Sequence, residues 1–158
     1  MTLISVPYVL NTYWKKVRTP TMTWMNNENK PIQDEDVDGY YGFVYVIRNK
    51  VDGRRYVGRK YLTKAGYKTV KGKRKKIRVS SDWRNYWGSN TELQEDVKRL
   101  GEDSFERSII KLCRNRSECS YWETHYIFQF QALLSDRWYN QWVTCKISKK
   151  NLKTVLES

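Results

Sequence analysis

Residues 42–60, GFVYVIRNKVDGRRYVGRK, predict two short β-strands joined by a tight turn. The run 43–47 is β-branched and aromatic, a composition that suits a pleated, half-buried surface. Asp52-Gly53 is a strong hairpin signal, because glycine readily takes the positive φ that such a turn needs. The second strand then resumes at Arg55 and ends in the sequence YVG at residues 56–58.

Each predicted strand carries a tyrosine, Tyr45 in the first and Tyr56 in the second. Side chains alternate along a strand, so Phe43, Tyr45 and Ile47 share one face. On this stretch alone two interpretations stay open. The tyrosines are either ordinary amphipathic core residues of a hairpin or members of a functional site.

Composition favours one nucleic-acid-binding domain. A chain of 158 residues suits a single domain, and its net charge of +13 with 15% aromatic residues is typical of proteins that bind polyanions. An anionic membrane surface is the weaker alternative, because no basic amphipathic helix with a wide apolar face is recognisable. No run of 18 apolar residues exists, so we expect no membrane span and no membrane partner.

Cysteine and histidine usage argues against several metal and disulfide classes. Cys113, Cys119 and Cys145 lack CxxC spacing, which makes a disulfide framework or a zinc ribbon improbable. A single histidine excludes a His-rich metal site. Reduced thiols in a cytoplasmic protein are the simplest interpretation.

A basic run follows the hairpin. Residues 59–81 hold ten basic residues and no acid, and Gly66 and Gly72 interrupt any helix, so we expect a loop. A charge run of this kind is either a solvated flexible loop or a surface that contacts phosphates. The candidate nucleic-acid contacts are Arg59, Lys71, Lys73, Arg74, Lys75, Lys76 and Arg78.

Two helices and a third strand are predicted after the basic run. Residues 89–92, SNTE, form a capping box ahead of a helix that ends at Gly101. Residues 105–113 are apolar and β-branched enough for a strand. Ser117 then caps a long helix that is expected to reach about Leu134.

Glu123 is the most informative anomaly of the second helix. At 100° per residue it falls inside the apolar stripe of that helix, formed by Cys119, Tyr126, Ile127, Phe130, Leu133 and Leu134. A buried carboxylate costs several kcal/mol unless it is paired or binds a metal. A Glu paired with a basic residue, or a helix rotated so that Glu123 reaches solvent, are the other interpretations.

The two ends differ from this middle. Residues 1–39 mix aromatic residues with prolines, lack clean periodicity and end in an acidic cluster, so we expect an irregular arm with an acidic linker. That arm is a candidate docking segment for a protein partner. Residues 40–145 form the expected domain, and residues 146–158 form a basic tail with weak helical periodicity.

The ordered set of features resembles the GIY-YIG nuclease superfamily over residues 40–140. It includes FVY and YVG on two strands, a capped helix, a third strand, a helix with a core-facing Glu and a following Asn. The phrases SDWRNYWGSN and LSDRWYN are similar to phage-encoded members related to homing endonucleases. The resemblance implies a fold that mixes helices and strands, in the broad α/β class and more narrowly α+β. Its small three-stranded antiparallel sheet would be flanked by helices.

The resemblance also implies a site. Glu123 would bind one divalent metal, Mg²⁺ or Mn²⁺, and Tyr45 and Tyr56 would line the site, one of them orienting or deprotonating the attacking water. Asn140 fits the asparagine that is structural or borders the site in the family.

One feature of the family pattern is displaced. The family's catalytic arginine normally follows the second tyrosine by some ten residues, where this chain has Gly66 in the basic run. We expect Arg84 in the WRNYW segment to replace it, with Arg78, Arg59 and Lys60 as rivals. Tyr86 is the candidate for the family's second-base position.

Two functions follow from these features. The leading hypothesis is a metal-dependent DNA endonuclease that uses Tyr45, Tyr56, Arg84 and Glu123, supported by Lys60, Tyr86 and Asn140. The alternative is a catalytically degenerate module that binds nucleic acid through its basic run and its aromatic residues.

Overall fold

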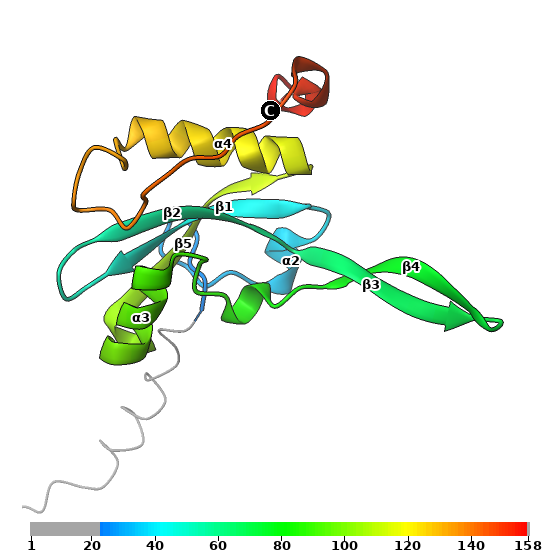
Figure 1. Ribbon diagram of the computed structural model, residues 1–158, viewed down its shortest axis with the longest axis horizontal. Coiled ribbons are helices and arrows are strands. Elements are labelled where there is room, and N and C mark those ends of the chain that lie inside the picture. Colours follow the sequence, from blue (N-terminus) through cyan, green and yellow to red (C-terminus); the bar gives the residue numbers. More distant parts are fainter. Residues whose placement is uncertain (1–22, 158) are drawn as a thin grey trace, which may run out of the picture.

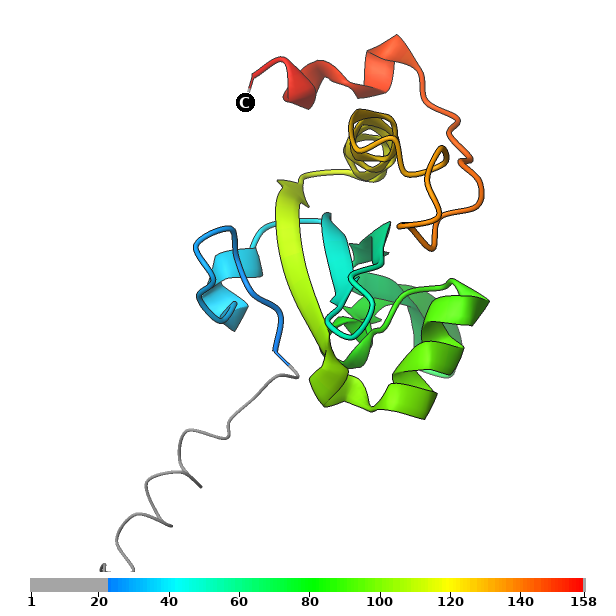
Figure 2. The ribbon, with the colours of Figure 1, turned by 90° about the vertical axis from the view of Figure 1, so that its left-hand side faces the viewer.

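The main sheet has three antiparallel strands. The computed structural model describes residues 23–157, and β1 (Gly42–Asn49), β2 (Arg55–Tyr61) and β5 (Phe105–Cys113) pair in the order β2-β1-β5 (Figure 1). Helices α3 (Thr91–Leu100) and α4 (Arg116–Gln129) lie on opposite sides of this sheet (Figure 2). The predicted α+β architecture, with a small antiparallel sheet between helices, is therefore confirmed.

The first hairpin forms as its sequence predicts. Gly53 has a φ of +81°, and its N–H donates to the carbonyl of Asn49 at 2.9 Å to close the turn. The resulting register places Tyr45 opposite Gly58 and Ile47 opposite Tyr56. Both tyrosines thus emerge from the same face of the sheet.

Each face of the sheet has its own core. Phe43, Tyr45 and Ile47 of β1 pack with Leu93 and Val97 of α3. The alternate residues belong to the other face, where Val44 and Val57 pack with Cys113, and with Cys119 and Ile127 of α4. A sheet buried on both faces needs apolar residues at successive positions, and this explains the continuous run 43–47.

The basic run forms a second sheet. β3 (Thr63–Val70) and β4 (Lys73–Ser80) pair antiparallel over their whole lengths and project from the body as a hairpin (Figure 1). The expected loop is therefore wrong. The reason is that Gly72 (φ +71°) and Lys71 (φ +50°) supply a two-residue turn with positive φ at both positions, the geometry that twisted hairpins favour.

Both helices begin close to the predicted residues, with small shifts. Asn90 caps α3 in place of Ser89, accepting from the N–H of Leu93 at 2.9 Å, and Gly101 (φ +87°) ends it as expected. Asn115 caps α4 in place of Ser117, accepting from the N–H of Glu118 at 2.9 Å.

Helix α4 ends earlier than its apolar stripe predicts. It stops at Gln129, and Gln131 has a φ of +53°. Leu133 and Leu134 therefore lie beyond the helix and are exposed, so the last part of the predicted stripe is wrong. The earlier residues of the stripe, Cys119, Tyr126 and Ile127, do pack in the core between α4 and the sheet.

The flanking segments pack on the body. Trp24 is buried against Phe43 and Tyr45, Met25 bridges to Ser108 of β5, and α2 (Asp34–Val37) follows. At the other end the chain passes over α4 and contains the short turns η3 (Lys149–Asn151) and η4 (Lys153–Val155). The aromatic residues Tyr8, Tyr13 and Trp14 of the expected arm lie outside the described residues.

Candidate active site

Glu123 faces the sheet and pairs with Arg59. It lies one helical turn from Cys119 and one from Ile127, both buried, and its side chain is only 17% exposed. One guanidinium nitrogen of Arg59, on β2, donates to a carboxylate oxygen of Glu123. Burial raises the pKa of the Glu123 carboxyl above its ordinary value, and the charge of Arg59 opposes that rise. The sequence left open whether Glu123 faces the core or is paired with a basic residue. In the structure it does both.

A cavity of about 270 Å³ lies beside this ion pair, which forms part of its wall. Its polar lining comes from both faces of β2, so the cavity lies at the outer edge of that strand. Its walls are formed by Tyr56, Arg59, Ser89, Glu123, Ile127, Asn140, Trp142, Val143 and Thr144. A polar space of this size has room for several waters or for a phosphate group.

Tyr56 reaches the cavity, whereas Tyr45 lies behind it. The hydroxyl of Tyr56 is 3.2 Å from that of Ser89, and burial raises its pKa, with the nearby Glu123 charge adding to the shift. Tyr45 is 1% exposed, and burial raises its pKa well above 10, with further increases from Tyr56, Tyr86 and Glu123. Both phenols are therefore neutral near pH 7, and Tyr56 is the one that a molecule in the cavity can touch.

Gly58 allows the two tyrosines to lie together. A Cβ at this position would stand 2.3 Å from the Tyr45 hydroxyl oxygen and 2.9 Å from a Tyr56 ring carbon. The ring of Tyr45 thus crosses the place where a side chain of its cross-strand partner would project. The glycine of the YVG sequence is required by this contact.

Asn140 secures the edge of β2. Its side-chain oxygen accepts from the N–H of Val57 at 2.9 Å, and its side-chain nitrogen donates to the carbonyl of Val57 at 2.9 Å. The neighbouring Tyr139 N–H donates to the carbonyl of Arg55 at 2.8 Å. Residues 139–140 therefore bond to the outer edge of β2, where a further strand would otherwise pair. The same bonds place Asn140 in the wall of the cavity.

The structure does not bring Arg84 to this cavity. Its guanidinium donates to Asp34 of α2 at 2.5 Å and stacks over Trp83, and half of its side chain is exposed. Arg59, one of the rivals, lines the cavity and pairs with Glu123. Side-chain alternation along β2 explains why Arg59 reaches Glu123. Arg59 leaves the strand on the same side as Val57, toward α4.

Lys60 and Tyr86 form a separate contact on the α3 side of the sheet. The ammonium of Lys60 lies 3.9 Å from the centre of the Tyr86 ring and donates to Asp82 at 2.7 Å. Tyr86 in turn packs edge-on against Tyr45. These residues support the tyrosine pair from behind and do not line the cavity.

Ser89, Trp142, Val143 and Thr144 line the cavity but were not expected from the sequence. Ser89 precedes the cap of α3, and its proximity to Tyr56 depends on how that helix docks. The other three residues belong to an extended segment without a recognisable pattern. No local signal in the sequence identifies any of the four.

Glu123 is the one acidic residue in the wall of the cavity, among the residues that the structure describes. Residues 23–157 contain no group of three or more His, Cys, Asp or Glu side chains placed to hold a metal together. A single carboxylate beside a polar space fits a hard cation such as Mg²⁺, which keeps several of its waters. The donor set therefore fits the implied metal.

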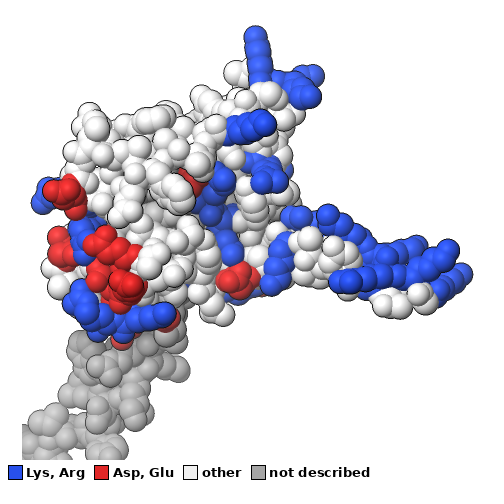
Figure 3. Space-filling view, in the orientation of Figure 1, with Lys and Arg blue, Asp and Glu red and all other residues white. Residues whose placement is uncertain are grey.

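Positive charge gathers on one side of the molecule. In Figure 3, lysines and arginines cover the β3–β4 hairpin and continue across the body toward the C-terminal segment, whereas most acidic side chains lie at the far end of the body. The candidate contacts Lys71, Lys73, Arg74, Lys75, Lys76 and Arg78 are all exposed on this hairpin. None of the helices in residues 23–157 is both long enough and apolar enough to cross a membrane.

Comparison with known proteins identifies one family. The family model described as "Putative endonuclease segE, GIY-YIG domain" matches residues 24–143, which include the main sheet, the projecting hairpin and every wall residue of the cavity except Thr144. No curated protein matches the chain. No solved structure matches it either.

Proposed function

The chain belongs to the GIY-YIG endonuclease family, and on that premise we propose that it is a metal-dependent endonuclease that hydrolyses phosphodiester bonds in DNA. One observation carries the proposal. Arg59 and Glu123 meet in a polar cavity that the hydroxyl-bearing Tyr56 also lines. The resemblance to phage-encoded members extends the proposal to a phage-encoded, homing-endonuclease-like enzyme that acts in the host cytoplasm.

Glu123 is the proposed ligand for Mg²⁺ or Mn²⁺. Its position at the base of the cavity leaves space for the waters that such an ion keeps. A bound ion of this kind neutralises charge on phosphate oxygens and makes its water more acidic. Glu123 must be ionised to bind it, and Arg59 favours the ionised form against the cost of burial.

Arg59 is the proposed replacement for the displaced family arginine. Its guanidinium already points into the cavity, and five N–H donors allow it to hold Glu123 and a phosphate oxygen together. Arginine stays charged at any working pH, so Arg59 can stabilise the negative charge that grows on the phosphate in the transition state.

Tyr56 is the proposed residue that positions the attacking water. Its phenol lines the cavity, and its raised pKa keeps the proton on the hydroxyl group, so Tyr56 acts as a hydrogen-bonding group. Tyr45 holds the ring of Tyr56 from behind, at a centroid distance of 6.2 Å. Asn140 fixes the strand from which Tyr56 and Arg59 both project.

The proposal is tested by incubating supercoiled plasmid with Mg²⁺ and either the wild type or Glu123→Gln, with EDTA as a control. Glu123→Gln keeps the size of the side chain and a hydrogen-bond acceptor for Arg59, so the fold should persist. We expect metal-dependent nicking or linearisation by the wild type and its loss in the variant, with DNA binding retained. Full activity in the variant would contradict the assignment of Glu123.

A binding module without cleavage activity remains the second candidate, and one observation favours it. The carboxylate of Glu123 is already neutralised by Arg59, so the buried charge is compensated without a metal. In the same plasmid experiment, this candidate predicts no cleavage by either protein and binding that weakens as salt rises.

A further inference from the structure

The two faces of the β3–β4 hairpin differ in chemistry. The register Tyr67↔Lys76 and Thr69↔Arg74 places these side chains on one face, which we name the arginine face: Tyr67, Thr69, Arg74, Lys76 and Arg78. The alternate residues form the lysine face: Lys64, Lys68, Lys73, Lys75, Ile77 and Val79. Both arginines of the hairpin are on the first face, and four of its six lysines are on the second.

The arginine face begins at the candidate active site. Arg59, Tyr61 and Thr63 alternate along the strand from β2 into β3 and so leave it on the same side. Contacts confirm this continuity at the base of the hairpin. The ring of Tyr41 lies 5.1 Å from that of Tyr61 and 5.5 Å from the guanidinium of Arg78. A molecule bound at Arg59 therefore meets the arginine face next.

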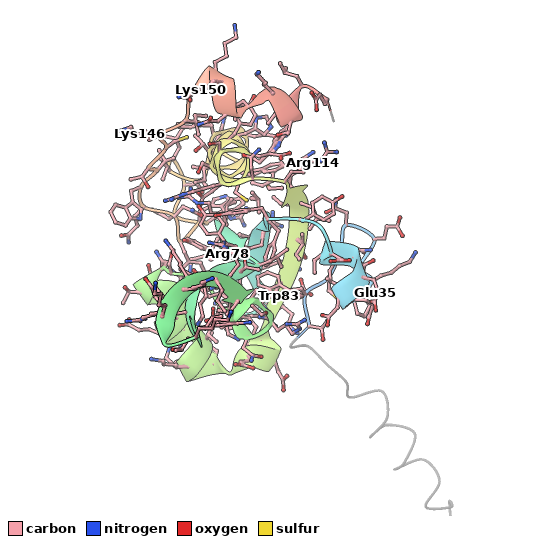
Figure 4. The ribbon with its side chains drawn as sticks, turned by 90° about the vertical axis from the view of Figure 1, so that its right-hand side faces the viewer. Glu35, Arg78, Trp83, Arg114, Lys146 and Lys150 are labelled. Carbon is pink, nitrogen blue, oxygen red and sulfur yellow. The ribbon has the colours of Figure 1, made fainter. Side chains whose placement is uncertain are left out.

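The side chains of the arginine face are held in place. The guanidinium of Arg78 donates to the hydroxyl of Thr63 at 2.8 Å and to its carbonyl at 3.0 Å. The guanidinium of Arg74 stacks over the ring of Tyr67 at 4.0 Å. In Figure 4, which faces the hairpin, the labelled Lys146 and Lys150 lie on the α4 side of Arg78 and extend the positive surface. Arginines ordered in this way lose less freedom when they bind a nucleic acid.

The lysine face shows a different arrangement. Val79 lies so close to Gly66 that a Cβ there would stand 2.8 Å from a methyl group, and Ile77 and Val79 are half-buried. This face thus contains the small apolar packing of the hairpin, with lysines around it. Lysine is a strongly hydrated point charge, suited to a general positive field more than to a specific contact.

We propose that the hairpin enters the major groove of duplex DNA as a two-stranded ribbon, with the arginine face against the base edges and the lysine face outward. The proposal rests on DNA as the substrate proposed above. The major groove, about 12 Å wide, admits a two-stranded ribbon, and a strand of eight residues spans roughly 27 Å along it. Arg74 and Arg78 are of the type that binds guanine edges in this groove.

The test compares two double variants with equal loss of charge from the same strand. Arg74→Gln with Lys76→Gln alters the arginine face, and Lys73→Gln with Lys75→Gln alters the lysine face. Binding of each full-length protein to a 40-base-pair duplex with alternating A·T and G·C blocks is measured in EDTA, so that affinity is read without cleavage and both guanine edges and A·T minor grooves are present. Methyl green, which occupies the major groove, and netropsin, which occupies the minor groove, serve as competitors.

We expect methyl green to displace the wild type and netropsin to leave it bound. The arginine-face variant should lose about tenfold or more in affinity, because two groove contacts disappear. It should also lose its sensitivity to methyl green. The lysine-face variant should lose less than about threefold and keep that sensitivity, since its charges act at longer range.

Three results would overturn the proposal: equal losses in the two variants, displacement by netropsin instead of methyl green, or a larger loss in the lysine-face variant. Failure of the nuclease proposal can be distinguished from failure of the groove assignment. A wild type that binds in the expected groove but never nicks plasmid leaves the groove assignment intact. A wild type that nicks plasmid and fails the groove test overturns only the groove assignment.

Discussion

The main sheet and the projecting hairpin use strands of similar length for opposite purposes. In β1 seven of the eight residues are buried or half-buried, whereas in β4 six of the eight are exposed. The strands of the sheet are held by two apolar cores, but those of the hairpin are held mainly by their backbone pairing. The comparison indicates that the sheet provides stability and positions the candidate active site, whereas the hairpin provides a charged surface outside that site.

The largest expected effect is on stability and separates the two regions directly. Phe43→Ala should lower the free energy of unfolding by about 3–5 kcal/mol, because Phe43 is fully buried between Trp24 and Trp83. Tyr67→Ala, on the exposed hairpin, should change it by less than about 0.5 kcal/mol. Urea unfolding followed by tryptophan fluorescence gives both values. Similar losses in the two variants would refute the division of roles.

Removing the hairpin should lower DNA affinity without unfolding the body. Thr63 pairs with Ser80, and the N–H of Ser81 donates to the carbonyl of Leu62 at 2.9 Å, so an Asn-Gly turn can replace residues 64–79. We expect the free energy of unfolding to stay within about 1 kcal/mol. Affinity for duplex DNA should fall by about a hundredfold at low salt, with a flatter salt dependence.

Fluorescence anisotropy at several salt concentrations measures this affinity and its slope. The matched control keeps residues 64–79 and carries only Lys71→Asn, which gives the same Asn-Gly turn at the tip of the intact hairpin. A shortened protein that binds as tightly as the wild type would show that the body alone carries the DNA-binding surface.

A smaller effect concerns how the free energy of unfolding falls in acid. We expect this pH dependence to come from Asp96 in the body of the protein, not from the hairpin. Arg99, Tyr139 and Arg54 all contact the carboxylate of Asp96, and the hydrogen bond from Arg99 is the largest cause of its lowered pKa. Because the folded pKa lies below the unfolded value of about 3.9, this stabilisation is present above pH 4. It is lost as the pH falls through the folded value.

Asp96→Asn should therefore destabilise the protein by about 1–3 kcal/mol at pH 7 and progressively less as the pH falls below about 4. Urea unfolding of wild type and variant across this range checks the sign. Glu106→Gln is the control, because Glu106 makes an exposed ion pair with Arg48 and should cost at most about 1 kcal/mol. A loss that is independent of pH in Asp96→Asn would contradict the account.

The sequence predicted the elements whose signals are local. Asp52-Gly53, the apolar run from residue 43 and the cap near residue 90 each act within a few residues, and all three appear in the structure. The core-facing position of Glu123 was visible from helical periodicity for the same reason. These features needed no knowledge of the tertiary arrangement.

The remainder depended on contacts between distant residues. The β3–β4 hairpin was missed because its lysines and arginines obscure a strand alternation that backbone pairing stabilises. The sequence could not rank Arg59 above Arg84, because the meeting of Arg59 with Glu123 depends on how α4 packs on the sheet. Ser89 and residues 142–144 reach the cavity only through the docking of α3 and of the C-terminal segment.

The most direct test of the account compares the two arginines in single-turnover plasmid cleavage with Mg²⁺. Arg59→Ala removes the guanidinium beside Glu123, and Arg84→Ala removes one that is paired with Asp34 outside the cavity. We predict a loss of about 10²–10³ in rate for Arg59→Ala, as for other groups that stabilise transition-state charge, and a change of less than about twofold for Arg84→Ala. The reverse order, or equal losses, would contradict the placement of the active site at the edge of β2.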